Sequence, residues 1–251
     1  MKTSVLPADL RFRACNDLIR LGVESDGGYL VSAADVSRSK LLLGFGINTD
    51  WAFEMDFHDR NPVPIIAYDA STNFKLFVKH SVAALFQREI GKALVTPFRY
   101  RSLNRFFSEP NVLHKKFVGL DAGGVHVSMR EVMEDLPVDT DVFVKMDIEG
   151  SEYRCLDDIL ACQHMITAFV AEFHDVDLHI DRLLEFVRAF ELEIAHIHAN
   201  NHSPMTDDGL PLVLEITFSR HGAFTDDPPA LPHSLDRACN FDDEEILIGF
   251  A

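Results

Sequence analysis

The sequence predicts an α/β fold in which a mainly parallel, doubly wound sheet is covered by helices on both faces. Short apolar segments alternate with helix-like stretches from about Lys40 to Phe190. These segments are apolar throughout, as expected for strands buried on both faces. With 251 residues, 47% of them apolar and 25% charged, the chain can form one large core. We expect a single domain over residues 1–251, with an N-terminal cap segment at 1–39 and the α/β core at 40–251.

Seven segments are predicted to form the sheet. They are residues 40–46, 63–69, 114–120, 141–147, 165–172, 193–198 and 212–218. Helices are expected at residues 50–59, 73–92, 128–136, 151–160 and 177–190, and residues 93–111 are interpreted as an irregular insertion that covers the site. Ligands of such sheets bind beyond the carboxyl ends of the parallel strands, so the candidate site residues are sought there.

The charge balance bears on the partners of the protein. The net charge is −17, from 23 basic and 40 acidic residues. Nucleic-acid backbones require clustered Lys and Arg, and an excess of acid disfavours them. The one basic stretch, residues 99–105, is interpreted as a solvated loop and helix face. We therefore expect a small-molecule partner and no nucleic acid.

Cysteine usage and hydropathy bear on the compartment. The four cysteines show no C-x-x-C spacing, and in a chain of this size they are expected to be reduced and mostly buried. No apolar run approaches the roughly 18 residues that a membrane span requires. The first ten residues lack the apolar core of a signal peptide. We expect a cytoplasmic protein without membrane contact.

A short glycine motif follows the first predicted strand. Gly44 and Gly46 allow the backbone to pass close to a ligand, and the next helix offers free N–H groups. The second strand ends at Asp69, 25 residues after Gly44, a spacing at which an acid binds ribose hydroxyls. Thr49 replaces the third glycine of the dinucleotide fingerprint, which disfavours a nicotinamide-dependent dehydrogenase. The alternative is a tight strand–helix turn followed by a helix-capping acid.

Acidic side chains cluster after the fourth and fifth predicted strands. Asp147, Glu149 and Glu152 follow the fourth strand closely. Glu149 and Glu152 also suit the positive end of a helix, so capping explains part of this cluster. Glu172 and His174 lie two residues apart at the end of the fifth strand and therefore share a face. The pattern predicts a polar site at this edge of the sheet.

The sixth predicted strand carries polar side chains on one face, namely His196, His198 and Asn200. For His196 we prefer the interpretation of an edge histidine bonded to backbone. Asp147, Glu172 and His198 are the candidates for contact with the reacting group or for its general base. A second hypothesis is a divalent cation: carboxylate-rich ligation suits magnesium or manganese, and two histidines favour zinc or iron. Its candidate ligands are Asp147 and Glu172, with His174 or His198, and Asn200.

The segment Val144-Lys-Met-Asp147-Ile-Glu149-Gly150-Ser-Glu152 resembles the lysine–aspartate–x–glutamate–glycine–x–glutamate signature of the FkbM-like methyltransferases. This family is a branch of the class I S-adenosylmethionine-dependent enzymes. The resemblance runs from about Arg20 to Phe250, although the first turn has fewer glycines than the usual methyltransferase loop. Further matching pieces, in the order of the family, are Arg20–Tyr29, Gly44–Asp50, Glu172–His174, His198–Asn201 and Leu231–Asp236.

The resemblance implies a Rossmann-like sheet of seven strands whose last strand is antiparallel. It also implies S-adenosylmethionine as the cofactor and methyl transfer to a hydroxyl of a sugar or secondary metabolite. Carried over to this sequence, it assigns Gly44, Gly46 and Asn48 to the methionine part, Asp69 to the ribose, Asp121 and Ala122 to the adenine, and Asp26, Gly27, Gly28 and Tyr29 to a cap near the methionine carboxylate.

Two other functions remain open from the sequence. A divalent-metal-dependent hydrolase would use the same acids and histidines around an activated water. It would not require the glycine turn or Asp69, and for that reason it ranks second. A protein that binds the cofactor without catalysis is the third possibility.

Overall fold

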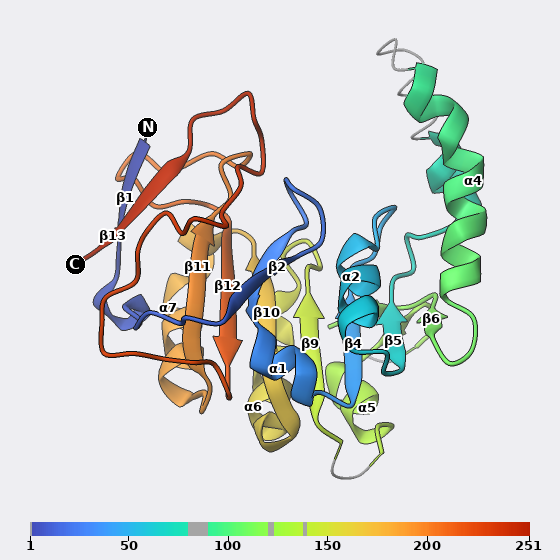
Figure 1. Cartoon of the computed structure of the whole chain (residues 1–251), viewed down its shortest axis with the longest axis horizontal. Coiled ribbons are helices and arrows are strands. Elements are labelled where there is room, and N and C mark those ends of the chain that lie inside the picture. Colours follow the sequence, from blue (N-terminus) through green and yellow to red (C-terminus); the bar gives the residue numbers. More distant parts are fainter. Residues whose placement is uncertain (1, 80–89, 120–122, 138–139) are drawn as a thin grey trace.

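The computed structural model describes residues 2–79, 90–119, 123–137 and 140–251. Its centre is a seven-stranded sheet (Figure 1). β12 is antiparallel to both of its neighbours, and the other pairs are parallel. This confirms the predicted doubly wound sheet. The strand order is β11 (Glu193–Ala199), β12 (Leu214–Ser219), β10 (Ile166–Phe173), β9 (Val142–Met146), β4 (Leu41–Phe45), β5 (Ile65–Tyr68) and β6 (Val112–His114).

Six of the seven predicted strands lie within two residues of their expected bounds. The prediction of a strand at 114–120 was wrong, because the third strand of the sheet, β6, ends at His114. The apolar pair that follows it forms β7 (Phe117–Val118), which pairs with β8 (His126–Val127) outside the main sheet. A short apolar run shows that a strand forms but not which partner it takes.

Helices cover both faces of the sheet (Figure 1). On one face, α5 (Met129–Glu134), α6 (Leu156–Ala161) and α7 (Val176–Ala189) contribute to the larger apolar core. On the other face, α1 (Ala33–Arg38) and α2 (Ala52–Arg60) pack over a smaller core. The expected helix at 151–160 begins as a 3-10 turn, η2 (Glu152–Arg154), before α6. Two further 3-10 turns are η1 (Ala8–Leu10) and η3 (Gln163–Met165).

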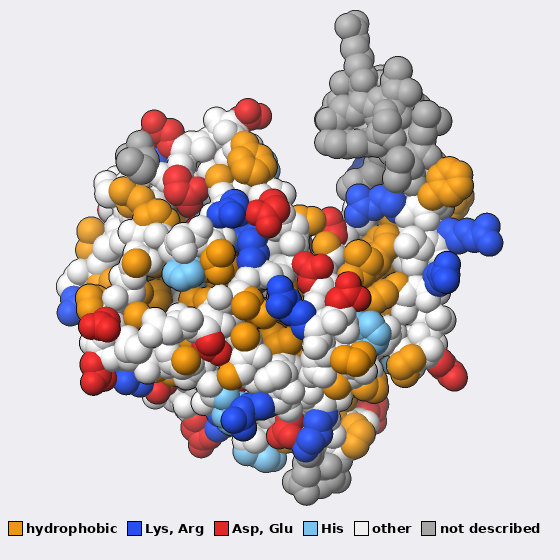
Figure 2. All heavy atoms as spheres, viewed as in Figure 1, with side chains coloured by type: hydrophobic (Ala, Val, Ile, Leu, Met, Phe, Trp, Pro, Cys, Tyr) orange, Lys and Arg blue, Asp and Glu red, His pale blue; other side chains and the backbone are white. Residues whose placement is uncertain are grey.

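The prediction of an irregular stretch at 93–111 was largely wrong. Residues 74–79 are helical, and α4 (Ile90–Phe106) is a helix that stands away from the sheet in Figure 1. The sequence of this helix does not separate apolar from charged residues onto opposite faces, so periodicity gives no helix signal there. In Figure 2 the surface is hollowed between α4 and the β2–β3 hairpin.

The N-terminal segment folds against the sheet rather than apart from it. β1 (Lys2–Leu6) pairs in parallel with β13 (Ile246–Phe250), which joins two segments from opposite ends of the sequence. β2 (Leu18–Leu21) and β3 (Tyr29–Ser32) form a hairpin. The Thr217 hydroxyl on β12 donates to the Leu30 carbonyl at 2.6 Å and ties this hairpin to the sheet. The boundary between cap and core at residue 40 stays a prediction.

Two further observations concern side chains and helices. All four cysteines are free thiols: Cys15, Cys155 and Cys239 are buried, and Cys162 is half-buried. Within the described ranges, no helix is both long and apolar enough to cross a membrane.

Candidate functional site

The turn after β4 is closed against the end of β9. Gly46 has φ of 80°, and a Cβ on it would lie 1.6 Å from the carbonyl oxygen of Asp147. Because L-residues rarely adopt this conformation and no atom fits that space, only glycine is compatible with the turn. The Asp147 amide in turn donates to the Phe45 carbonyl at 3.0 Å. The glycine motif and the acidic signature therefore meet backbone to backbone.

Asp69, at the end of β5, fastens this turn from the other side. Its Oδ2 accepts hydrogen bonds from the amides of Ile47 at 2.9 Å and Asn48 at 2.6 Å. Its Oδ1 accepts from the amide and the hydroxyl of Ser71, both at 2.6 Å. Burial raises the pKa of Asp69, but the hydrogen bonds from Ser71 and Asn48 outweigh burial and lower it. Asp69 is thus ionised and held in one position.

A pocket of about 460 Å³ lies beyond the carboxyl ends of β4, β5 and β9. This volume is in the range of small-molecule sites. Acidic side chains line one part of it, and aromatic and aliphatic side chains line another. The lining residues are Gly46, Asn48, Tyr68, Asp69, Ser71, Leu76, Phe117, Val118, His126, Asp147, Ile148, Glu149 and Ser151.

Three of the residues predicted to bind the cofactor, Gly46, Asn48 and Asp69, line this pocket. Gly44 lies inside β4, where a Cβ would come 3.2 Å from Glu54 Oε1. Asp121 and Ala122 fall outside the described residues. Phe117 and His126 were not foreseen as pocket residues, because the strand of Phe117 was misplaced and that of His126 was unassigned. Tyr68 was missed although its strand, β5, was predicted.

Lys145 is a buried cation that lies behind the glycine turn. The sequence alone gave this residue no role. Its Nζ donates to the Gly46 carbonyl at 2.6 Å and lies 3.9 Å from Asp147 Oδ2. The ammonium also lies 6.0 Å from the centre of the Tyr29 ring. Its side chain is 8% exposed, so these contacts replace most of its hydration. Lys145 links the glycine turn to Asp147.

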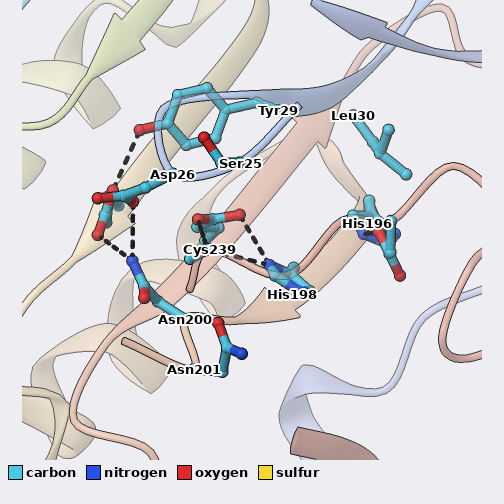
Figure 3. A network of polar contacts seen from close by, with 12 residues as sticks. Ser25, Asp26, Tyr29, Leu30, His196, His198, Asn200, Asn201 and Cys239 are labelled. Atoms are coloured by element: carbon cyan, nitrogen blue, oxygen red, sulfur yellow. Dashed lines mark hydrogen bonds and ion pairs between the residues drawn. The ribbon is translucent and has the colours of Figure 1, made fainter. Parts of the chain in front are cut away.

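A second polar network lies beneath the β2–β3 hairpin (Figure 3). The Tyr29 hydroxyl donates to Glu172 Oε2 at 3.1 Å, and Asn200 Nδ2 donates to Glu172 Oε1 at 2.9 Å. Asn200 Nδ2 also donates to Asp26 Oδ1 at 3.1 Å. Burial, together with the nearby carboxylate of Asp147, raises the pKa of Glu172 well above its usual value. Glu172 is therefore an acid that holds its proton more strongly than usual.

The predicted cap at residues 26–29 belongs to this network. Asp26 and Tyr29 contact Asn200 and Glu172, and neither lines the 460 Å³ pocket. Gly27 has φ of 86°, and a Cβ on Gly28 would lie 2.0 Å from the Val23 carbonyl. The two glycines therefore shape the hairpin loop that presents Asp26. A contact with the methionine carboxylate stays a prediction.

His174 lies among carboxylates at the end of β10. Its Nδ1 is 3.1 Å from Glu152 Oε1, whereas its Nε2 is 3.7 Å from Glu149 Oε2 and 3.8 Å from Glu172 Oε1. Burial lowers the pKa of His174, but the Glu152 carboxylate and its neighbours raise it to about 9. His174 is therefore a cation at neutral pH.

His198 lies in a row of paired residues across three strands. Glu172 on β10 pairs with Glu215 on β12, which in turn pairs with His198 on β11. His198 Nδ1 is 3.0 Å from Glu215 Oε2, and its Nε2 is 2.8 Å from Glu245 Oε1. Burial lowers the pKa of His198, but Glu215 and its neighbours raise it well above the usual value. A carboxylate faces each ring nitrogen, which disfavours a general-base role, and contact of His198 with the reacting group stays a prediction.

His196 differs from its predicted environment. Its Nε2 lies 2.8 Å from Asp236 Oδ1, so a carboxylate rather than backbone faces the ring. Glu215, Glu245, Asp236 and Cys239 were all missed. Glu215 is a lone acid inside an apolar strand, and only its register with the neighbouring strands shows its importance. The other three lie in a loop segment without periodicity.

The five predicted metal ligands do not come together as one set. Among the described residues, His198 is grouped with Glu215 and Cys239, whereas His174 is grouped with Asp147 and Glu149. Asn200 donates its amide N–H groups to Asp26 and Glu172. No one of these groups holds all five residues, and a metal centre built on Asp147 and Glu172 with one of the two histidines stays a prediction. The three groups whose possible ligand atoms lie within 4.8 Å of one another are His198–Glu215–Cys239, Asp147–Glu149–His174 and Asp26–Glu172–Glu215.

No protein-family model matches the sequence, and no curated protein matches it either. Solved structures of similar fold include an rRNA methylase from Streptococcus thermophilus, with a TM-score of 0.40, 10% identity, and coverage of 75% of this chain and 92% of that one. Precorrin-6y C5,15-methyltransferase from Geobacter metallireducens has a TM-score of 0.37 and 16% identity, with coverage of 75% of this chain and 86% of that one. TrmK from M. capricolum, in complex with S-adenosyl-homocysteine, has a TM-score of 0.38 and 11% identity, with coverage of 82% of this chain and 72% of that one.

The sheet order and the antiparallel β12 give this chain a Rossmann-like fold. The activity of each similar structure belongs to that protein. The prediction of no nucleic acid is corrected: it rested on the net charge of −17, which does not exclude a nucleic-acid substrate, and an rRNA methylase is among the solved structures of similar fold. The charge of a whole chain does not describe the charge of one face.

Proposed function

We propose that this protein is an S-adenosylmethionine-dependent methyltransferase. The supporting observation is the turn at Gly46, which closes on Asp147 and faces the anchored carboxylate of Asp69 in one pocket. The chain order in the sheet reverses between β4 and β9, and ligands of doubly wound sheets bind at such a switch point. The resemblance of the acidic signature to the FkbM-like branch agrees with this location.

The residues of the pocket fit the chemistry of this cofactor. Asp69 offers an ionised carboxylate for ribose hydroxyls, and Tyr68 and Phe117 offer aromatic surface for a base. Asp147 and Glu149 supply acid beside the turn, which suits a cationic ligand. When bound, S-adenosylmethionine supplies a methyl group on a positively charged sulfur.

We further propose that the acceptor is a hydroxyl, as in the FkbM-like enzymes, on a sugar or secondary metabolite, and that Asp147 contacts it. Methyl transfer is an in-line displacement, so orientation and deprotonation of the acceptor matter most. Asp147 lines the pocket and its side chain is 27% exposed. Burial raises the pKa of Asp147, which makes it a stronger base than an exposed aspartate, and Lys145 opposes the rise. Glu172 lies deeper in the structure and orients Tyr29 and Asn200.

Calorimetric titration with S-adenosylmethionine and S-adenosylhomocysteine tests the cofactor. We expect saturable binding of both, weakened by roughly 1–3 kcal/mol in Asp69→Ala, the usual cost of leaving buried polar partners unpaired. Asp59→Ala, which removes an exposed acid of α2, serves as the matched control and should leave affinity unchanged. No binding by the folded wild-type protein would refute the proposal.

The acceptor is tested separately with methyl-labelled S-adenosylmethionine. Hydroxylated small molecules, sugars among them, and RNA are supplied in parallel reactions. We expect label in the small-molecule fraction and its loss in Asp147→Asn. Transfer to RNA alone would overturn the acceptor proposal and keep the cofactor proposal, and binding without transfer to any acceptor would favour a binding protein.

A further inference from the structure

Three metal-ligating side chains of different chemistry meet beside the sheet, away from the cofactor pocket. His198 is on β11, Glu215 is on β12, and Cys239 is in the loop segment before β13. They are 6 to 8% exposed, and none of the three lines the 460 Å³ pocket. Figure 3 shows His198 and Cys239 converging on one carboxylate. The mechanism proposed above uses none of these groups.

The separations within this group match those of a small metal site. His198 Nδ1 is 3.0 Å from Glu215 Oε2, Cys239 Sγ is 3.1 Å from Glu215 Oε1, and Cys239 Sγ is 3.9 Å from His198 Nδ1. Bond lengths of roughly 2.0–2.3 Å to a tetrahedral zinc ion place its ligand atoms about 3.3–3.5 Å apart. The two contacts with Glu215 involve different carboxylate oxygens, but one possible ligand atom from each residue lies within 4.8 Å of the other two. A shift of the side chains would centre an ion among these atoms.

A carboxylate on the far side of His198 orients the ring. Glu245 Oε1 lies 2.8 Å from His198 Nε2, the nitrogen that points away from the group. Histidines that bind a metal through one nitrogen almost always donate the other N–H to such a partner. Glu245 therefore holds His198 with Nδ1 toward Glu215 and Cys239.

The loop that supplies Cys239 is held in place by other contacts. Asn201 Nδ2 donates to the carbonyls of Asn240 at 2.9 Å and Asp243 at 3.1 Å, and the Asn240 amide donates to Asn201 Oδ1 at 2.9 Å. The thiol is thus brought to the sheet edge by contacts that do not involve His198 or Glu215. This preorganisation favours a ligand function for Cys239 over an accidental neighbourhood.

We propose that His198, Glu215 and Cys239 bind a single zinc-like transition-metal cation, with water completing the coordination. Thiolate and imidazole together select such a cation over magnesium or calcium. On binding, the Cys239 thiol and the His198 Nδ1–H each release a proton to solvent. The Nε2–H of His198 keeps its hydrogen bond to the Glu245 carboxylate. Because two protons leave as the ion of charge +2 enters, the net charge of the group does not change. It joins the loop before β13 to β11 and β12.

Cobalt substitution tests the site directly. The full-length protein is stripped with a chelator, checked for retained fold by circular dichroism, and titrated with Co²⁺ alone. We expect one equivalent to bind, with a thiolate-to-cobalt charge-transfer band and the visible bands of tetrahedral cobalt. Zn²⁺ should displace the cobalt and raise the Tm. Absence of the charge-transfer band in the folded protein would overturn the proposal.

Variants separate ligation from packing. Cys239→Ser should abolish the band and the Zn²⁺-dependent rise in Tm, whereas Cys155→Ser, which removes another buried thiol, should keep both. Glu245→Gln should weaken Co²⁺ binding about 10- to 100-fold while the band persists, as expected for a partner of a ligand. Retention of the band in Cys239→Ser would refute the assignment. None of these readouts depends on S-adenosylmethionine, so failure here leaves the proposed function standing.

Discussion

The two halves of the carboxyl edge of the sheet solve the problem of buried polarity in different ways. At the ends of β4 and β5, the buried acid Asp69 is satisfied mainly by backbone amides and a hydroxyl. At β10, β12 and β11, carboxylates and histidines satisfy one another, as in the row Glu172–Glu215–His198. The first half is fixed by backbone geometry, and the second depends on charge. Substitutions in the glycine-turn half should therefore destabilise the protein by steric clash. The stability of the charged row should instead depend on pH and on bound cations.

Gly46→Ala should have the largest effect, because it breaks the backbone contact on which the pocket depends. The new Cβ would lie 1.6 Å from the Asp147 carbonyl, at φ of 80°. We expect a loss of about 4 kcal/mol or more in the free energy of unfolding, the range of severe core lesions. Gly27→Ala is the control, because φ is 86° there but the nearest atom is 3.9 Å away, so only the roughly 1–2 kcal/mol of left-handed strain applies. Urea denaturation measures both, and equal losses would contradict the steric argument.

Lys145→Met should come next, since it removes the cation that joins the glycine turn to Asp147. Removing one partner of a buried charged pair costs roughly 3 kcal/mol. Several charged groups act on Asp147, and loss of the Lys145 ammonium should raise the pKa of Asp147. The acid limb of the pH–rate profile should therefore move to higher pH. Lys145→Arg should restore part of the activity, and an unmoved acid limb in Lys145→Met would show that Lys145 only fills space. The groups are Lys145, His174, Glu152, Glu215, Glu149, Asp26, Glu172 and Glu54.

Glu54→Gln should increase stability above neutral pH. Glu54 is 1% exposed and its Oε1 has no hydrogen-bond partner among the described residues. Burial raises its pKa to about 7. The unfolded chain ionises at its ordinary pKa near 4.5, so folded stability falls as pH rises from there to about 7 and then levels off. We expect Glu54→Gln to gain roughly 2 kcal/mol at pH about 8 and little at pH about 4, by urea denaturation. A gain independent of pH would contradict the ionisation argument.

His174→Gln should have the smallest effect and should act through pH alone. The folded pKa of His174 is raised to about 9, so its contribution is complete below the ordinary value of 6.5 and is lost as pH rises through about 9. Between these limits the wild type should lose roughly 1–2 kcal/mol of stability that the variant does not lose. Urea midpoints across this window measure the difference. Parallel curves for the two proteins would show that the carboxylates around His174 do not hold its proton.

The sequence predicted the sheet and the glycine-turn half of the edge well, because both follow from local pattern. Gly46 and Asp69 end apolar strands that are adjacent in the sheet, so their meeting follows from topology. The charged row could not be predicted, since the position of Glu215 opposite both Glu172 and His198 depends on the register of an antiparallel strand. Cys239 and Glu245 arrive on a loop, where no period specifies which side chains point inward.

The row Glu172–Glu215–His198 also has a consequence for how the chain folds. β12 is paired on both sides, so a slip of one residue would bring Leu214 or Ile216 into the row and turn Glu215 toward the larger apolar core. A misregistered sheet would then bury a carboxylate without a partner, at a cost of several kcal/mol. The same side chains that gather charge at the edge thus act as a register mark, which penalises misaligned pairings of the one strand that reverses direction.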